Sequence, residues 1–383
     1  MRYTIFINFP GLATSDEFAF GIRLLAKMLP SVHWVTGNSR SFEEFWQSQE
    51  STAKKLTGAV VLLHSPYIVP GKDCLERLAS ALDSSGTEAV LPVDPRGWGL
   101  DGTAADYATL RGFERFSAKL AGAGQHLLPY DGRVPIMQMI PAERLRRITP
   151  ENWLKVLTPP ASSLLVSDAI IHPYHEYYAG DRSEILGVLP PGIGRLLDVG
   201  GGEGNFAALA KQHLQCEAHV VEMNAEAAAL AAGKVDRVWV GDFLSLIIEE
   251  RYDCVTLLDV IEHGADPAGV LRRAAELLVP GGSVIASIPN IGHWTVVADL
   301  LEGRWDYLPV GIACWTHLRF FTLQTIKDIF HDAGLKVLLA KPLPMPAPLP
   351  MKKALNGLAG TGLSLEWESL DAYAYHVVAC RVA

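Results

Sequence analysis

The sequence predicts an α/β protein of two domains, and two observations carry this prediction. Short apolar segments that suit strands alternate with amphipathic segments that suit helices along most of the chain. In the second half, over residues 196–206, an apolar segment runs into a glycine-rich turn that opens a helix. This order of elements is typical of a mostly parallel sheet covered by helices.

The glycine-rich turn is the strongest single signal for a ligand. Gly200, Gly202 and Gly204 lack the Cβ atoms that would hold a ligand away from the backbone. Asp198 leaves a carboxylate at the end of the preceding strand, which suits a ligand with an ammonium group, such as S-adenosylmethionine, better than a pyrophosphate. The turn also satisfies G-x-G-x-x-A, and Glu222 has the spacing of a ribose-binding acid in a dinucleotide fold. A nicotinamide dinucleotide and a purely structural turn therefore stay open.

The next two expected strands also end in acids. Residues 218–222 end in Glu222, whose carboxylate can accept hydrogen bonds from both ribose hydroxyls of an adenosine. Residues 238–243 end in Asp242 and Phe243, an acid for the adenine amino group and a ring for the adenine face. Each acid alone also suits a helix N-cap. Three successive strands ending in acids favour one ligand site along this edge of the sheet.

Further motifs follow in order. Residues 252–259 suit a fourth strand, residues 267–278 a helix that ends at a Pro-Gly-Gly turn, and residues 283–290 a fifth strand. The motifs stand at Asp198 to Gly204, Asp259 to His263, Pro280 to Gly282, Ser287 to Asn290, His293-Trp294 and Thr316 to Thr322. With these motifs, residues 170–383 resemble the class I S-adenosylmethionine-dependent methyltransferases, in particular the ubiquinone-biosynthesis O-methyltransferase-like subgroup.

The resemblance implies a Rossmann-like, seven-stranded methyltransferase sheet whose last strand is antiparallel, and residues 335–340 and 374–380 suit its terminal pair. It also implies S-adenosyl-L-methionine as the cofactor. Tyr178 is expected to face the sulfonium and Arg182 to pair with the carboxylate of the methionine end. Tyrosines that simply pack the domain join are the alternative. The expected cofactor-binding residues are Tyr178, Arg182, Asp198, Gly200, Gly202, Glu203, Glu222, Met223, Asp242, Phe243, Asp259 and Val260.

Methyl transfer is an in-line displacement, so the protein must align the acceptor and remove its proton. His263, His293 and His317 are the catalytic candidates, and His263 leads because it follows the fourth strand and an imidazole has an unperturbed pKa of about 6.5. A histidine that caps its own loop is the alternative. No metal is assigned, but Asp259, Glu262 and His263 would share one face of a helical turn and are the candidate ligands. An ordinary solvated turn remains open.

Aromatic and basic side chains are dense between residues 290 and 321, and we expect a wall for the acceptor there. They are Trp294, Trp305, Trp315, Tyr307, Arg304 and Arg319, with His293 and His317. We expect an O-methyltransferase that acts on a small-molecule or carbohydrate-like acceptor. An NAD-dependent oxidoreductase and a catalytically silent cofactor-binding module stay open, as does N-methylation.

The domain boundary is expected near residues 158–163, giving an α/β domain over 1–160 and the methyltransferase domain over 161–383. Strands are expected at 3–8, 32–35, 59–64, 88–94 and 134–139, with helices at 15–28, 41–55 and 74–82. Residues 60–75 are similar to the middle of a GT-A-type sugar transferase, but residues 64–70 hold no acid for its divalent ion. We therefore expect a degenerate, non-catalytic domain. A plain structural or dimerising domain is the alternative.

Composition narrows the function classes. A formal net charge of -9 argues against a nucleic-acid partner. The 5 cysteines are scattered singly, which argues against a disulfide framework and a thiolate zinc site. The apolar start of the chain is too short for a signal peptide, and no segment approaches the length of a membrane span. We expect a cytoplasmic protein with a small-molecule partner, no membrane partner and possible homo-oligomers.

Overall fold

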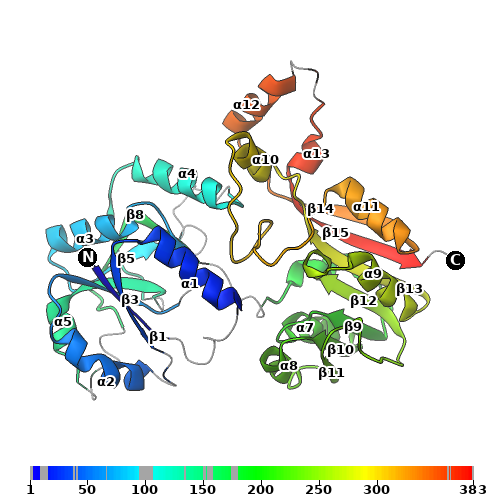
Figure 1. The fold of residues 1–383 in the computed structure, drawn as a ribbon, viewed down its shortest axis with the longest axis horizontal. Helices are drawn as coiled ribbons and strands as arrows, with labels where there is room; N and C mark the ends of the chain where they lie inside the picture. The colour runs from blue at the N-terminus through cyan, green and yellow to red at the C-terminus, as the bar shows by residue number, and fades with distance from the viewer. Residues whose placement is uncertain are drawn as a thin grey trace. The chain divides into compact units, whose positions relative to one another are not determined.

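A computed structural model describes residues 3–8, 16–37, 39, 42–65, 67–94, 107–132, 135–149, 152, 158–173, 180–359, 362 and 364–381. The chain divides into two compact units, Met1–Tyr174 and His175–Ala383 (Figure 1). This division lies further along the chain than the expected boundary at residue 160, because the strand β8 (Leu164–Pro173) pairs with β5 (Val90–Val93) of the first unit.

The first unit is built on a mixed sheet. Its strands are β1 (Tyr3–Asn8), β2 (Val32–Gly37), β3 (Ala59–Leu63), β4 (Ile68–Pro70), β5, β6 (Leu127–Pro129), β7 (Met137–Pro141) and β8. The sheet order is β2-β1-β3-β7-β5-β8-β4, and β6 pairs with β8. The strand β7 is antiparallel to both of its neighbours, whereas β1, β2 and β3 run parallel.

Helices cover both faces of this sheet because its strands are apolar on both sides. They are α1 (Asp16–Met28), α2 (Phe42–Ala53), α3 (Cys74–Ser85), α4 (Leu110–Ala121) and α5 (Ala142–Arg146). Ile5 and Ile7 point to the face that α1 and α3 cover, while Phe6 between them packs with α2 and α5 on the other face.

The second unit contains the sheet that the sequence predicts for the ligand site. Its strands are β9 (Arg195–Val199), β10 (Glu217–Glu222), β11 (Arg237–Val240), β12 (Tyr252–Leu258), β13 (Leu278–Pro289), β14 (Leu335–Pro344) and β15 (Ala372–Arg381). The sheet order is β11-β10-β9-β12-β13-β15-β14. The first five strands in this order are parallel, and β15 is antiparallel to both β13 and β14. The prediction of a seven-stranded sheet with an antiparallel last strand is confirmed.

Helices lie on both faces of the second sheet as well. They are the 3-10 helix η1 (Ser183–Val188), α7 (Asn205–Leu214), α8 (Ala225–Ala231), the 3-10 turn η2 (Ile261–His263), α9 (Pro267–Glu276), α10 (Trp294–Leu301), α11 (Leu323–Asp332), α12 (Leu349–Ala359) and α13 (Trp367–Leu370). The main core packs α9 and α11 on one face, and η1 and α7 pack on the other. Figure 1 shows α10, α12 and α13 grouped together, and they share a small core of their own around Trp294 and Leu355.

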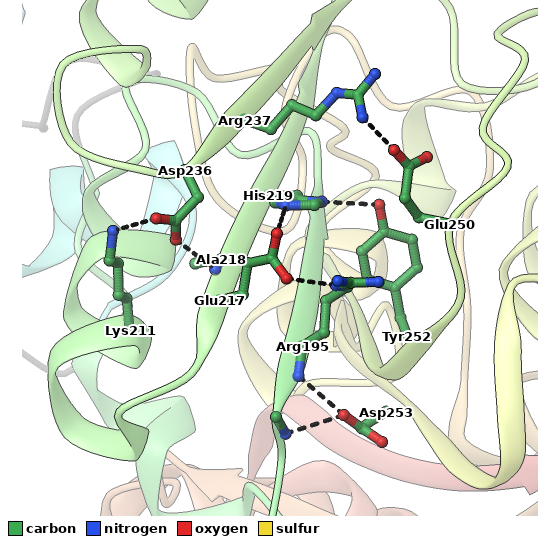
Figure 2. Close-up of polar contacts among 11 residues, drawn as sticks. Arg195, Lys211, Glu217, Ala218, His219, Asp236, Arg237, Glu250, Tyr252 and Asp253 are labelled. Carbon is green, nitrogen blue, oxygen red and sulfur yellow. Dashed lines mark hydrogen bonds and ion pairs between the residues drawn. The ribbon is translucent and has the colours of Figure 1, made fainter.

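A network of polar side chains ties the amino ends of the central strands of this sheet (Figure 2). Arg195 Nε donates to Glu217 Oε2 over 2.6 Å, and the buried His219 lies between Glu217 Oε1 at 2.9 Å and the Tyr252 hydroxyl at 3.0 Å. The backbone N–H groups at the start of β9 donate to the Asp253 carboxylate. The polar residues at this edge therefore satisfy one another, and the candidate ligand residues lie at the opposite, carboxyl edge.

Within the residues that the structure describes, no helix is long and apolar enough to cross a membrane. All 5 cysteines are free thiols.

Candidate active site

The glycine-rich turn between β9 and α7 depends on glycine for its shape. Gly200, Gly202 and Gly204 have φ angles of 69°, 54° and 76°, in a backbone region that residues other than glycine rarely adopt. A Cβ atom on Gly200 would lie 2.9 Å from Val260 Cγ2. The Gly200 N–H donates to the Val221 carbonyl over 2.8 Å, which ties the turn to β10. Glycine is therefore required at this turn, which packs closely on Val260 and is bonded to β10.

Asp198 lies beneath this turn and not at its rim. Its side chain is 2% exposed, and Oδ1 accepts a hydrogen bond from Thr256 Oγ1 over 2.6 Å. Burial raises the pKa of Asp198 to about 7, although the Thr256 hydrogen bond and the charge of Arg182 act in the opposite direction. The Asp198 carboxylate, which the sequence placed at the ligand, is thus buried beneath the turn.

Glu222 stands at the carboxyl end of β10, as predicted. Its Oε2 accepts from the Gly202 N–H over 2.8 Å and its Oε1 from the Asn224 N–H over 2.8 Å. Each carboxylate oxygen can accept a second hydrogen bond, so the pair can still receive two hydroxyl groups. Met223, next in the chain, is 71% exposed and offers an apolar surface beside this carboxylate.

The strand-end pair Asp242 and Phe243 separates in the structure. The exposed Asp242 accepts from the Leu244 N–H over 3.2 Å and from the Ser245 hydroxyl over 2.8 Å, so it caps its own turn. Phe243 is 5% exposed and belongs to the main core. The expectation that Phe243 covers the face of a ligand is wrong, because this ring faces the sheet interior.

Arg182 and Asp259 form an ion pair at the edge of β12 and β13. Arg182 Nη1 donates to Asp259 Oδ2 over 2.5 Å, and Arg182 Nη2 donates to Ser287 Oγ over 2.8 Å. The Ser287 hydroxyl donates to Asp259 Oδ1 over 3.0 Å, and Arg182 Nε donates to Glu184 Oε1 over 2.8 Å. We call these three residues, Arg182, Asp259 and Ser287, the arginine cluster.

Three further residues were predicted to bind the cofactor. Glu203 forms an ion pair with Lys234 over 3.6 Å. Val260 packs against the core and lies under Gly200. Tyr178 lies outside the described residues.

Glu262, His263 and His317 come together beside the arginine cluster, with candidate ligand atoms that all lie within 4.8 Å of one another. Glu262 is 1% exposed, and neither of its carboxylate oxygens has a hydrogen-bond partner among the described residues. Burial and the charge of Asp259 raise the pKa of Glu262 well above its usual value. A buried carboxylate without donors is costly unless a proton or a cation accompanies it.

Two imidazoles lie beside this carboxylate. The His263 and His317 rings meet edge to face with centroids 4.6 Å apart. His317 Nδ1 lies 3.0 Å from the Ile312 carbonyl and must donate to it, so Nε2, which is 4.0 Å from Glu262 Oε1, carries a lone pair. Burial lowers the pKa of His317 to about 4, and burial also lowers the pKa of His263. Two neutral imidazoles and one carboxylate make a donor set suited to a divalent cation.

This cluster differs from the predicted metal candidates in one ligand. Asp259 precedes the helical turn η2 that carries Glu262 and His263. Its carboxylate is held by Arg182 and Ser287. His317, which comes from a distant loop, takes its place. The Leu318 and Arg319 N–H groups both donate to the Glu262 carbonyl, over 2.8 and 3.0 Å, and this brings the loop to the turn.

His293 does not fit the predicted catalytic role. Its side chain is fully buried, Nε2 lies 3.0 Å from the Met345 carbonyl and Nδ1 lies 2.8 Å from the Thr295 hydroxyl. Both ring nitrogens are thus used within the fold, where they join the start of α10 to the segment after β14. Trp294 shares this role, because its Nε1 donates to the same carbonyl over 2.9 Å and its ring lies in the small core of α10, α12 and α13.

Trp305 and Tyr307 of the predicted wall form an exposed group with Phe320, whereas Trp315 is half-buried. Trp305 packs edge to face against Phe320, with centroids 5.1 Å apart, and against Tyr307 at 6.1 Å. Phe320 also lies 6.3 Å from the His317 ring. The three aromatic side chains are 36–44% exposed. Flat apolar surface is therefore available next to the Glu262 cluster.

Sequence reasoning missed three polar groups at this edge. Thr256 donates to Asp198, Ser287 bonds to both Arg182 and Asp259, and His376 lies opposite Ser287 in the β13–β15 register. His376 is 3% exposed, and its Nε2 has no hydrogen-bond partner among the described residues. Ser287 belongs to a motif that the sequence did single out, whereas nothing in the local sequence marks His376.

Comparison with known proteins agrees with this geometry. Residues 170–340 match a family model described as "Methyltransferase domain". The chain is 29% identical over 181 residues to a ubiquinone biosynthesis O-methyltransferase of Marinobacter nauticus, covering 44% of this chain and 71% of that protein. It is 30% identical over 152 residues to the protein of that name in Cereibacter sphaeroides, covering 37% of this chain and 60% of the relative.

Solved structures give a weaker likeness. The chain resembles an O-methyltransferase from neocarzinostatin biosynthesis, solved in complex with S-adenosylmethionine and 2-hydroxy-5-methyl naphthoic acid. The sequence identity is 18%, the TM-score is 0.34, and the match covers 49% of each chain. The nicotinamide alternative is not favoured, because the family match and the antiparallel β15 both agree with a methyltransferase.

Proposed function

We propose that the methyltransferase domain matched over residues 170–340 methylates an oxygen of a small-molecule acceptor bound beside Glu262, His263 and His317. The observation that carries this proposal is the pair of Glu262 oxygens, buried and without hydrogen-bond donors, facing two neutral imidazoles. The names of the curated relatives support oxygen as the methyl acceptor.

The carboxyl edge of the sheet fits S-adenosylmethionine. The open backbone of Gly200 and Gly202 admits the ligand, Glu222 has capacity to accept the two ribose hydroxyls, and Met223 offers apolar surface to the adenine. Arg182 supplies the cation for the methionine carboxylate. Asp198 stabilises the positive charge of the ligand from beneath the turn when it ionises.

The Glu262 cluster has the task of activating the acceptor. Glu262, His263 and His317 would hold a divalent cation there, and that cation would supply Lewis-acid chemistry by lowering the pKa of an acceptor hydroxyl. The hydroxyl proton would pass to solvent, the oxygen would bond to the methyl carbon in line, and the carbon–sulfur bond would break to leave S-adenosylhomocysteine. The loop contacts from Leu318 and Arg319 fix the geometry of the three ligand residues. His263 acting alone as the general base is the competing hypothesis for the same step, since its neutral ring is also able to accept a proton.

The acceptor that best suits this surface is a hydroxylated ring. Trp305, Tyr307 and Phe320 offer flat apolar faces close to His317, and such faces pack on the carbons of aromatic and sugar rings alike. The likeness of residues 60–75 to a sugar transferase, together with this aromatic surface, supports a carbohydrate-like acceptor. For the first unit we propose a role in acceptor recognition or assembly, supported by its separate sheet and cores. Its likeness to a GT-A sugar transferase stays a prediction.

The test distinguishes activation of the acceptor by a divalent cation from activation by His263 as a general base. The protein is stripped with EDTA, and transfer of labelled methyl to a panel of phenols, catechols and sugars is measured with and without added Mn²⁺ or Zn²⁺. We expect activity only with the cation, and Glu262→Gln is expected to abolish both turnover and Mn²⁺ binding in calorimetry. Glu276→Gln, at an exposed glutamate of α9, is the matched control. Full activity of the stripped protein, with loss only in His263→Ala, would overturn the cation in favour of the base.

A further inference from the structure

The two residues of the Arg182–Asp259 ion pair both have left-handed backbones. Arg182 has a φ of 46° and Asp259 a φ of 55°. Such conformations cost about 1–3 kcal/mol in residues other than glycine and persist only where surrounding contacts hold them. The contacts here are the Asp259 N–H donating to the Ser287 carbonyl over 3.0 Å and the ion pair itself at 2.5 Å.

These contacts occupy both oxygens of the Asp259 carboxylate. Oδ2 accepts from Arg182 over 2.5 Å, and Oδ1 accepts from the Ser287 hydroxyl over 3.0 Å. Arg182 is held a second time by Glu184, whose Oε1 accepts from Nε over 2.8 Å. One guanidinium therefore stands between two carboxylates, and it keeps an anchor if one of them is replaced.

Asp259 also borders the Glu262 cluster. It precedes the short turn η2, which carries Glu262 and His263. The charge of its carboxylate acts on Glu262, where it helps to raise the pKa of that buried group. Asp259 thus lies between Arg182, whose guanidinium would bind the methionine carboxylate, and the residues that would bind the divalent cation.

We propose that Asp259 is a positioning residue that couples the binding of the methyl donor to the binding of the divalent cation. This inference rests on the proposed function. When the methionine carboxylate takes Arg182, the guanidinium no longer neutralises Asp259, and the negative charge of Asp259 acts on the neighbouring cation site. The two ligands strengthen each other, and this effect is reciprocal because it is a coupling free energy.

The coupling makes the affinity of the cation site depend on whether the methyl donor is bound. Without the donor, Arg182 neutralises one carboxylate next to the cation site, so the site holds a cation less tightly. With the donor bound, the site gains charge at the moment when an acceptor hydroxyl is to be activated. The structure thereby favours activation of the acceptor only when a methyl group is ready to be transferred.

Calorimetric titration of Mn²⁺ into the stripped full chain tests this coupling. We expect saturating S-adenosylhomocysteine, which retains the methionine carboxylate, to tighten Mn²⁺ binding at least about fivefold, the lower end of typical coupling. 5′-Methylthioadenosine, which has the adenosine but no carboxylate, should leave Mn²⁺ affinity unchanged. Asp259→Asn should bind both ligands and lose the fivefold effect. Glu184→Gln also removes a carboxylate from Arg182 and should keep the effect, which makes it the matched control.

The outcomes separate this inference from the proposed function. Equal Mn²⁺ affinity with and without S-adenosylhomocysteine in the wild type, or a full effect retained in Asp259→Asn, would overturn the coupling and leave the cation site standing. A wild-type protein that binds no Mn²⁺, or a Glu262→Gln variant that binds it as tightly as the wild type, would overturn both.

Discussion

Replacing Asp198 with asparagine should remove a large part of the dependence of stability on pH. The side chain is 2% exposed and its pKa is raised to about 7 from 3.8, first by burial. Between these two values the folded state holds a proton that the unfolded state has lost. The free energy of unfolding therefore falls as the pH rises, in contrast to an ordinary ion-paired carboxylate.

The size of the effect follows from the shift. One pKa unit corresponds to 1.36 kcal/mol, so the complete penalty is about 4 kcal/mol, and about 2.6 kcal/mol of it develops between pH 5 and pH 8. Asparagine keeps the shape of the side chain and an oxygen for the Thr256 hydroxyl, which lies 2.6 Å from Asp198 Oδ1. It cannot ionise, so this penalty is absent in the variant.

Urea unfolding at pH 5, 6, 7 and 8 measures the difference between Asp198→Asn and the wild type. Because other groups titrate equally in both proteins, the difference isolates Asp198. We expect the variant to gain about 2.6 kcal/mol on the wild type between the two ends of this range. A constant difference, or one that moves in favour of the wild type as the pH rises, would refute the argument that burial dominates at this carboxyl.

Three further predictions concern other parts of the site. Gly200→Ala should weaken S-adenosylhomocysteine binding at least about tenfold, because its Cβ would meet Val260 at 2.9 Å. The control Gly192→Ala, at φ 80° with no atom within 4 Å of the new Cβ, should lose only about 1 kcal/mol of stability. Equal binding by both variants in calorimetry would contradict this. Glu262→Met should leave the free energy of unfolding unchanged or raise it by up to about 3 kcal/mol, and Mn²⁺ should no longer stabilise the variant. A destabilised variant would argue that the carboxylate has partners. His293→Ala should lower the free energy of unfolding by about 2 kcal/mol while S-adenosylhomocysteine still binds, and lost turnover at unchanged stability would restore its catalytic role.

The sequence predicted those parts of the fold whose signals are local. The parallel strands β9, β10 and β12 are short apolar segments followed by turns, and they formed where expected. The strand β8 was missed because Asp168 interrupts its apolar pattern. In the structure Asp168 is 4% exposed and pairs over 2.6 Å with Arg77, a residue far away in the chain. A buried charge whose partner is distant leaves no periodic signal.

The site was predictable to the same extent. The glycine-rich turn and Glu222 are fixed by backbone geometry that the local sequence encodes. Helical spacing grouped Asp259 with Glu262, but spacing cannot show that Arg182 captures the Asp259 carboxylate. The sequence marked His317 as a catalytic candidate, but its place beside Glu262 depends on backbone contacts between its loop and the turn, and sequence spacing cannot show such contacts.

The measurement that tests the central claim most directly is calorimetric titration of the full chain with S-adenosylhomocysteine and, separately, with NADH. The account predicts that S-adenosylhomocysteine binds at one site per chain, that Glu222→Gln weakens this binding at least about tenfold, and that the exposed control Glu226→Gln does not. It predicts no binding of NADH. Binding of NADH without binding of S-adenosylhomocysteine would contradict it.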